Sequence, residues 1–158
     1  MSAIEATEAP GDEQAVLELL LPRAQLRIEG QLQDSGSLDA KALGVLGVDA
    51  AAIALLVAAR NELSSWWTVP GFALGIAGVL LLASVWPRTL DAGPDPRDFY
   101  EKMGSSTRLD ATRQMLAELL AAGDANDLLL PPKRRLFKAG FALLVAALLG
   151  ALIVALGA

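Results

Sequence analysis

The chain of 158 residues contains no cysteine and no histidine. Their absence excludes disulfides, thiol nucleophiles, imidazole bases and the usual structural zinc sites. The formal net charge of −5 argues against a general nucleic-acid binder, which needs a basic surface. No phosphate-binding loop or dinucleotide fingerprint is present. We therefore predict a protein that is not an enzyme and holds no metal, no cofactor and no nucleic acid.

The start of the chain also lacks the basic region and short apolar core of a signal peptide. Acidic residues gather there instead: Glu5, Glu8, Asp12 and Glu13. The first membrane span is therefore expected to act as its own insertion signal. Residues 1–11 are small, acidic and contain proline, which predicts a disordered N-terminus.

Apolar residues are abundant, at 54% of the chain with a mean hydropathy of +0.45, and they are concentrated in three blocks. Each block is long enough to cross a hydrocarbon core of about 30 Å at about 1.5 Å per helical residue. We predict spans at about 42–60, 69–86 and 137–157. Residues 12–158 would then form a single membrane domain of the all-α class, a helical bundle that spans the lipid bilayer.

Two further helices are predicted outside the spans. Residues 12–34 carry an apolar stripe at helical spacing, which predicts an amphipathic helix ending at the break from Asp34 to Ser37. The segment 87–136 is expected to be a cytosolic loop with one short helix from about residue 108 to 122. Thr107 and Asp110 resemble a capping box at its start, and Gly123 is expected to close it. Pro131 and Pro132 are expected to end a last short turn.

Tryptophans mark the limits of the second span. Trp66 and Trp67 precede it, and Trp86 ends it. Trp67 and Trp86 would lie about 28 Å apart along a helix, which matches the spacing of the two interfacial aromatic belts.

Basic residues predict the orientation. Arg60 is the one basic residue between the first two spans, whereas the segment from Arg88 to Lys138 contains nine. By the positive-inside rule, the N-terminus and the long loop are cytoplasmic and the C-terminus is outside.

Asp49 is the principal candidate for a functional residue. A carboxylate near the middle of a span costs about 2.5–3.5 kcal/mol on insertion scales, so it needs a partner or a role. One interpretation is an ion or proton path, or a switch inside the bundle. The other is a structural hydrogen bond or a protonated acid. Lys41 is not an easy partner, because it lies about 12 Å away along the helix.

A basic cluster precedes the last span: Lys133, Arg134, Arg135 and Lys138. It could contact a phosphate of a nucleotide or lipid, or it could anchor the span at the cytosolic face. Small residues are frequent in the spans, and Gly71 and Gly75 form a GxxxG pair that allows close helix packing within or between chains.

The first span opens with Asp39-Ala40-Lys41-Ala42, carries the mid-span Asp49, and is followed by a second span and a cytosolic segment. The segment 126–133 leads into the last span. This arrangement resembles bacterial small membrane proteins of the Pycsar-system effectors and the related SLATT membrane domains, over roughly residues 17–157. The double proline at 131–132 interrupts the continuous helix that the resemblance leads one to expect.

The resemblance implies a homo-oligomeric effector of anti-phage defence in the bacterial inner membrane. A cyclic pyrimidine nucleotide would activate it, and it would then impair membrane integrity. No separate nucleotide-binding domain is present, so a ligand site would have to be built from the cytosolic helices. The alternative is a non-catalytic accessory or scaffold membrane protein that docks a partner through those helices.

Overall fold

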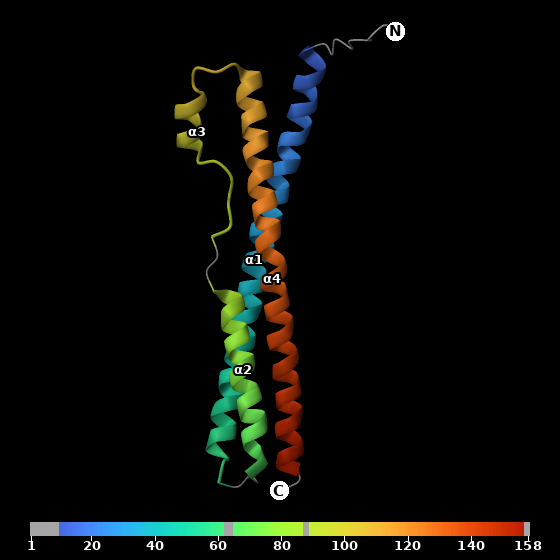
Figure 1. Ribbon diagram of the computed structural model, residues 1–158, viewed down its shortest axis with the longest axis vertical. Coiled ribbons are helices and arrows are strands. Elements are labelled where there is room, and N and C mark those ends of the chain that lie inside the picture. The colour runs from blue at the N-terminus through green and yellow to red at the C-terminus, as the bar shows by residue number, and fades with distance from the viewer. Residues whose placement is uncertain (1–9, 62–64, 87–88, 157–158) are drawn as a thin grey trace, which may run out of the picture. The chain divides into compact units, whose positions relative to one another are not determined.

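The computed structural model describes residues 10–61, 65–86 and 89–156, and the elements it contains over these residues are all helical (Figure 1). They are α1 (Pro10–Ala58), the 3-10 turn η1 (Ser65–Trp67), α2 (Thr68–Val85), α3 (Pro96–Met103) and α4 (Arg108–Leu156). Stretches of α1, α2 and α4 are long and apolar enough to cross a membrane. The predicted helical class is therefore confirmed, and the three apolar helices indicate a membrane protein.

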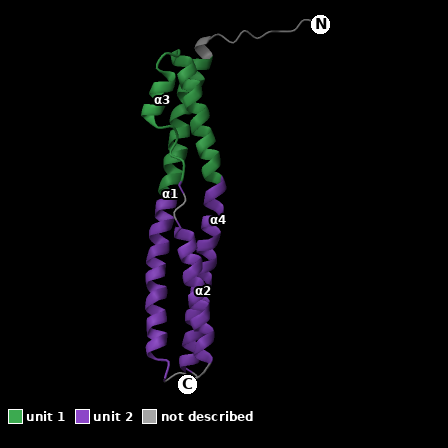
Figure 2. Cartoon of the chain, turned by 60° about the vertical axis from the view of Figure 1, so that its left-hand side comes forward, with its two compact units in different colours: residues 1–33, 90–127 green, residues 34–89, 128–158 purple. Residues whose placement is uncertain are grey.

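The chain divides into two compact units, shown in separate colours in Figure 2. Unit 1 comprises residues 1–33 and 90–127, and unit 2 comprises residues 34–89 and 128–158. Helices α1 and α4 contribute to both units, α3 belongs to unit 1, and α2 belongs to unit 2. Apart from residues 1–11, both units lie within residues 12–158, the region predicted as one membrane domain.

In unit 1, α1 and α4 pack in parallel. Glu13 pairs with Arg113, and further along both helices Arg27 pairs with Asp124. The core between the two helices consists of Leu17, Ala24, Ile28, Leu116, Leu119 and Ala122. The predicted amphipathic stripe thus points inward, with one exception: Leu32 is exposed and the neighbouring Gln31 is buried instead.

The segment that leads to α3 is fixed to α4 by one buried side chain. The Asn126 side chain accepts a hydrogen bond from the Asp91 amide and donates one to the Asp91 carbonyl, both at 2.8 Å. Gly93 follows with φ +90°, and a Cβ there would lie 2.8 Å from Leu119 Cδ2. Only glycine combines this backbone conformation with such a close approach to α4.

In unit 2, three helices pack around a second core, with α2 antiparallel to the other two. Position 71 of α2 faces Leu56 of α1, and position 78 faces Asp49. The core consists of Leu56, Leu74, Ala77, Leu144 and Ala147. The buried positions of α2 alternate at spacings of four and three, which is the repeat of helices that pack as coiled coils: Pro70, Leu74, Ala77, Leu81 and Ser84.

The predicted break from Asp34 to Ser37 is wrong, because α1 continues through it. Glycine and serine lower helix stability by about 1 kcal/mol each at most. Ser35 is buried and accepts a hydrogen bond from Lys133 of α4. This contact holds the helical backbone at the point where the local sequence disfavours it. Pro22 also lies inside α1.

The predicted ends at Gly123 and at the double proline are wrong as well, because α4 runs through all three residues. An interior proline costs about 3 kcal/mol and leaves a carbonyl without its helical donor. Pro131 and Pro132 lie on the exposed face, while their neighbours Leu130 and Lys133 are buried. Packing on that buried face offsets the local penalty. The continuous helix that the family resemblance leads one to expect is present.

Helix α3 lies in the segment that was predicted to be loop. Asp95 accepts a hydrogen bond from the Arg97 amide, and Pro96 occupies the first helical turn. Both features are helix-start signals that the sequence contains. The capping box at Thr107 is confirmed, since its hydroxyl accepts a hydrogen bond from the Asp110 amide at 3.2 Å. The predictions for residues 1–9 and 87–88 lie outside the described residues.

The role of Asn126 leads to a first prediction. Replacing it (Asn126→Ala) removes both bonds to the Asp91 backbone, so hydrogen exchange at the Asp91 amide should accelerate about tenfold. Mass-spectrometric hydrogen exchange on detergent-solubilised protein measures this. Gln114→Ala is the matched control, because Gln114 bonds only to its own helix at Glu118. Unchanged exchange at Asp91 in Asn126→Ala would contradict the assignment.

Candidate intramembrane site

Asp49 lies in the packed interior of unit 2 rather than on its outer surface. It is 2% exposed, and its Oδ1 atom has no hydrogen-bond partner among the described residues. It belongs to the same face of α1 as Ala42 and Leu56, which are also buried. A polar atom left unpaired in such a place costs about 1–3 kcal/mol. Asp49 is thus a buried carboxyl group with one oxygen that accepts no hydrogen bond from a described residue.

Gly78 of α2 covers this carboxylate. A Cβ at position 78 would lie 2.6 Å from Asp49 Oδ2, so any other residue there would clash. Beside it, Gly140 of α4 is also restricted, though less closely, because a Cβ would lie 3.0 Å from Leu81 Cγ and 3.2 Å from the Ala77 carbonyl oxygen. Glycines on two helices therefore allow close approach on both sides of α2 at this level. Sequence reasoning singled out Asp49 but did not find either glycine as its neighbour.

The GxxxG pair is divided between two environments. A Cβ at Gly71 would lie 3.4 Å from Leu56 Cδ2, so this glycine serves packing within the chain. A Cβ at Gly75 would meet no described atom within 4 Å. Gly71 and Gly75 therefore do not form one continuous surface that is free to pack against another helix.

The basic cluster separates into buried and exposed members. Lys133 is 5% exposed, and its Nζ donates to Ser35 Oγ at 2.9 Å and to Asp39 Oδ2 at 2.8 Å. Asp39, in the segment Asp39-Ala40-Lys41-Ala42 that opens the first predicted span, thus forms an ion pair with Lys133 of α4. Lys41, the other charged residue of this segment, is exposed and makes no ion pair within the described ranges.

The other members of the cluster lie at the surface of unit 2. Arg134 pairs with Asp34 at 2.8 Å, and both side chains are exposed. Arg135 and Lys138 are exposed and form no ion pair with any described residue. A phosphate contact by the cluster remains a prediction, and these two side chains are the ones available for it.

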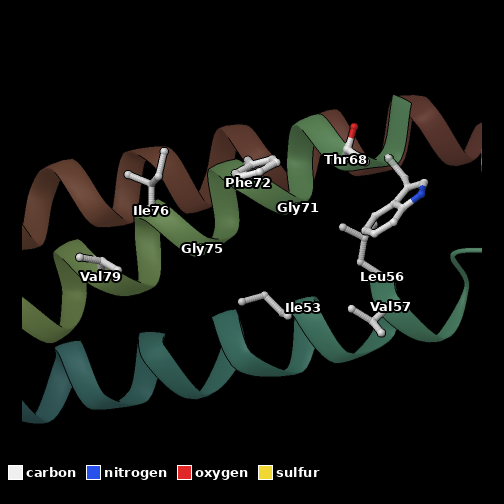
Figure 3. Close-up of a pocket in the computed structure, with 10 residues that line it drawn as sticks. Ile53, Leu56, Val57, Thr68, Gly71, Phe72, Gly75, Ile76 and Val79 are labelled. Atoms are coloured by element: carbon white, nitrogen blue, oxygen red, sulfur yellow. The ribbon is translucent and has the colours of Figure 1, made fainter. Parts of the chain in front are cut away.

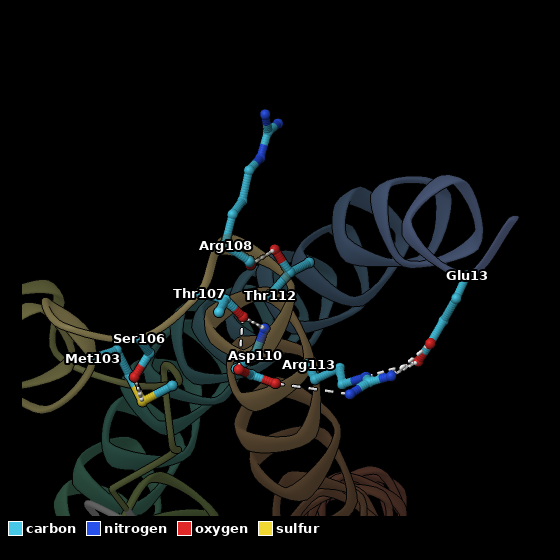
Figure 4. Close-up of polar contacts among 8 residues, drawn as sticks. All are labelled: Glu13, Met103, Ser106, Thr107, Arg108, Asp110, Thr112 and Arg113. Atoms are coloured by element: carbon cyan, nitrogen blue, oxygen red, sulfur yellow. Dashed lines mark hydrogen bonds and ion pairs between the residues drawn. The ribbon is translucent and has the colours of Figure 1, made fainter. Parts of the chain in front are cut away.

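Ion pairs connect α1 and α4 in unit 1. Figure 4 shows Arg113 between Glu13 of α1 and Asp110 of its own helix. Arg27 reaches Asp127 at 2.5 Å and Asp124 at 3.0 Å. The hydrogen bond from Arg27 to Asp127, and to a smaller extent the one to Asp124, raise the pKa of the Arg27 guanidinium. These exposed pairs set the register of the helices more than they stabilise them.

The tryptophans lie at the ends of α2. Trp66 and Trp86 are 70% and 66% exposed, whereas Trp67 packs against the core of unit 2. Exposed tryptophans at both ends of an apolar helix suit the predicted interfacial belts. The structure contains no membrane, so their role as anchors stays a prediction.

A buried polar network in unit 1 was missed from the sequence. Asn126 donates to Gln31 Oε1 at 3.3 Å, and Gln31 donates to the Gly123 carbonyl at 3.1 Å. Gln31 continues the spacing of the apolar stripe after Leu17, Leu21, Ala24 and Ile28. A search for polar residues at core positions of that repeat would have found it.

The Lys133–Asp39 pair provides a second prediction. Lys133→Met leaves Asp39 without its partner and should lower the free energy of unfolding by about 2–3 kcal/mol, below the range for fully buried pairs because Asp39 is partly exposed. Thermal unfolding in detergent, followed by circular dichroism, measures the change. Arg134→Gln, which removes an exposed pair, should cost less than about 1 kcal/mol. Equal effects of the two substitutions would count against a special role for Lys133.

Comparisons with known proteins do not assign the chain to a family. No family model, no curated protein and no solved structure matches it.

Proposed function

We propose that this protein is a non-enzymatic effector of the bacterial inner membrane. In this proposal it remains closed until a signal acts on its cytosolic part, and it then makes the membrane leaky. The observation that carries the proposal is Asp49, a carboxylate buried in an apolar span with an unpartnered oxygen. Intramembrane acids of this kind are expensive, and they mark functional sites by default.

The closed state depends on the contact between Asp49 and Gly78. Packing of α2 against α1 keeps water away from the carboxylate. If α2 moves away, the carboxylate becomes hydrated, and hydration of an acid is strongly favourable. An opened bundle would therefore be stabilised by water entering the span. In a homo-oligomer, several Asp49 side chains would line a shared wet path.

The helices that hold this site begin in the predicted cytosolic part. Both α1 and α4 contribute residues to unit 1 as well as to unit 2. A ligand that changed how α1 and α4 pair in unit 1 would thus act on helices that carry Asp49 and Lys133. The predicted orientation, with the N-terminus in the cytoplasm and the C-terminus outside, places unit 1 where a cytosolic signal reaches it.

The family resemblance supplies the class of signal. It supports a cyclic pyrimidine nucleotide made during phage infection as the activating ligand. Arg135 and Lys138 are candidate contacts for its phosphate, because they are exposed and form no ion pair with described residues. The defence role and the ligand are parts of the proposal.

The Gly78 contact gives the sharpest test. Gly78→Val places side-chain atoms where Asp49 Oδ2 lies, so α2 should separate from α1 without any signal. Cells that express this variant should lose membrane potential, as read with a voltage-sensitive dye. Gly44→Val in α1 is the matched control, since a Cβ at position 44 meets no described atom within 4 Å, and it should leave the potential unchanged.

The result needs confirmed membrane insertion of both variants, measured by immunoblot of the membrane fraction. Gly78→Val/Asp49→Ala should restore the potential, because the smaller side chain removes both the clash and the carboxylate. A normal potential in inserted Gly78→Val would show that separation of α2 does not open the membrane.

A further prediction concerns the signal. Wild-type cells supplied with cyclic UMP or cyclic CMP should depolarise, and Asp49→Ala cells should not. Arg135→Gln/Lys138→Gln should raise the nucleotide concentration needed, while the Gly78→Val variant should stay nucleotide-independent. Wild-type cells that keep their potential under both nucleotides, with the protein inserted, would favour the accessory or scaffold role.

A further inference from the structure

An apolar groove opens between α1 and α2 in unit 2, away from Asp49. Its volume is about 450 Å³, and Figure 3 shows the side chains that line it. Ile53 and Leu56 of α1 line one side, and Phe72 and Ile76 of α2 line the other. The groove lies within the two helices that are apolar enough to span a membrane.

The groove exists because of Gly75. This position has no described atom within 4 Å of where a Cβ would stand, so the space beside the helix is empty. Phe72, one turn earlier, is 77% exposed and forms a wall rather than a cover. Along this face of α2, a Cβ would meet atoms of α1 at Gly71 and at Gly78, but no described atom at Gly75 between them.

The surroundings of the groove define its occupant. Inside a membrane span, an apolar groove is unfavourable for water and is open to lipid tails. Trp67 lines the end of the groove near η1. Arg60 lies in the turn that ends α1, and its backbone amide donates a hydrogen bond to the carbonyl of Val57, a residue that lines the groove.

Arg60 supplies the charge that selects among lipids. It is exposed and forms no ion pair with any residue that the structure describes. Its guanidinium can hold a phosphate through two parallel hydrogen bonds. An apolar groove with an arginine beyond its interfacial end, one that pairs with no described residue, matches the chemistry of a phospholipid with a net negative head group.

We propose that this groove binds one acyl chain of an anionic phospholipid whose phosphate pairs with Arg60. A second copy of the chain fits the groove less well. Leu56 already fills the space beside Gly71, and the exposed Phe72 interrupts the remaining wall. The site is separate from the Asp49 contact, so it does not depend on the proposed effector function.

Trp67 provides a direct probe. In a Trp66→Phe/Trp86→Phe background, the fluorescence of the full chain comes from Trp67 alone. The protein is reconstituted into vesicles of phosphatidylcholine that contain a minor fraction of either brominated phosphatidylglycerol or brominated phosphatidylcholine. The apparent affinity obtained from quenching of Trp67 should be about tenfold higher for brominated phosphatidylglycerol than for brominated phosphatidylcholine. One charge-assisted contact gives a difference of about this size.

Two variants separate the tail from the head group. Gly75→Leu fills the groove and should abolish the extra quenching by the anionic lipid. Arg60→Gln should make the two brominated lipids equivalent while quenching by both persists. Gly47→Leu is the matched control, because a Cβ there also meets no described atom within 4 Å but the residue is not in the groove, and it should behave like the parent.

Two results would overturn the proposal. Equal quenching by both lipids in the parent would show that only ordinary surrounding lipid is present. Protection of Trp67 from both lipids, relieved as the protein is diluted in the bilayer, would show that a second copy fills the groove.

Discussion

A buried carboxylate in an apolar bundle constrains everything packed around it. Asp49 is 2% exposed, and no described residue bonds its Oδ1 atom. The carboxyl group is accommodated because α2 presents a glycine to it, and α4 presents another glycine to α2 at the same level. A larger residue at either position would force the neighbouring atoms of the packed helix to shift. The packing of unit 2 is therefore matched to this one polar group.

The other buried polar groups show that Asp49 is exceptional. Lys133 bonds to Ser35 and Asp39, and Asn126 bonds to Gln31 and to the backbone of Asp91. Buried polar networks in which each group is hydrogen-bonded fix the register of packed helices. A buried polar group that lacks a hydrogen-bond partner is typical of a functional site. Lys133 cannot serve Asp49 as well, since its partner Asp39 lies ten residues, or about 15 Å, before Asp49 along α1.

The sequence allowed the three apolar helices and Asp49 to be predicted, because hydropathy over a long window and a lone charge within it are local properties. The helix ends were wrong for a physical reason. Gly36, Pro131 and Pro132 disfavour helix locally, yet packing of neighbours such as Ser35 and Lys133 outweighs the penalty. The neighbourhood of Gly78 and Asp49 could not be predicted, since it depends on the register of α2 against α1. Helix α3 could have been found from Asp95 and Pro96 alone.

Two opposing free energies act at the Asp49 contact. Packing of α2 over the carboxylate gains dispersion contacts from Gly78 and its apolar neighbours, and each such contact is worth only about 0.1–0.2 kcal/mol. Exclusion of water leaves a polar oxygen unbonded, which costs about 1–3 kcal/mol. A leucine in place of Asp49 would add packing without this penalty, so the acid makes the closed bundle less stable than an apolar one. This penalty lowers the free energy needed to move α2 away from the carboxylate, which is the property that the proposed switch requires.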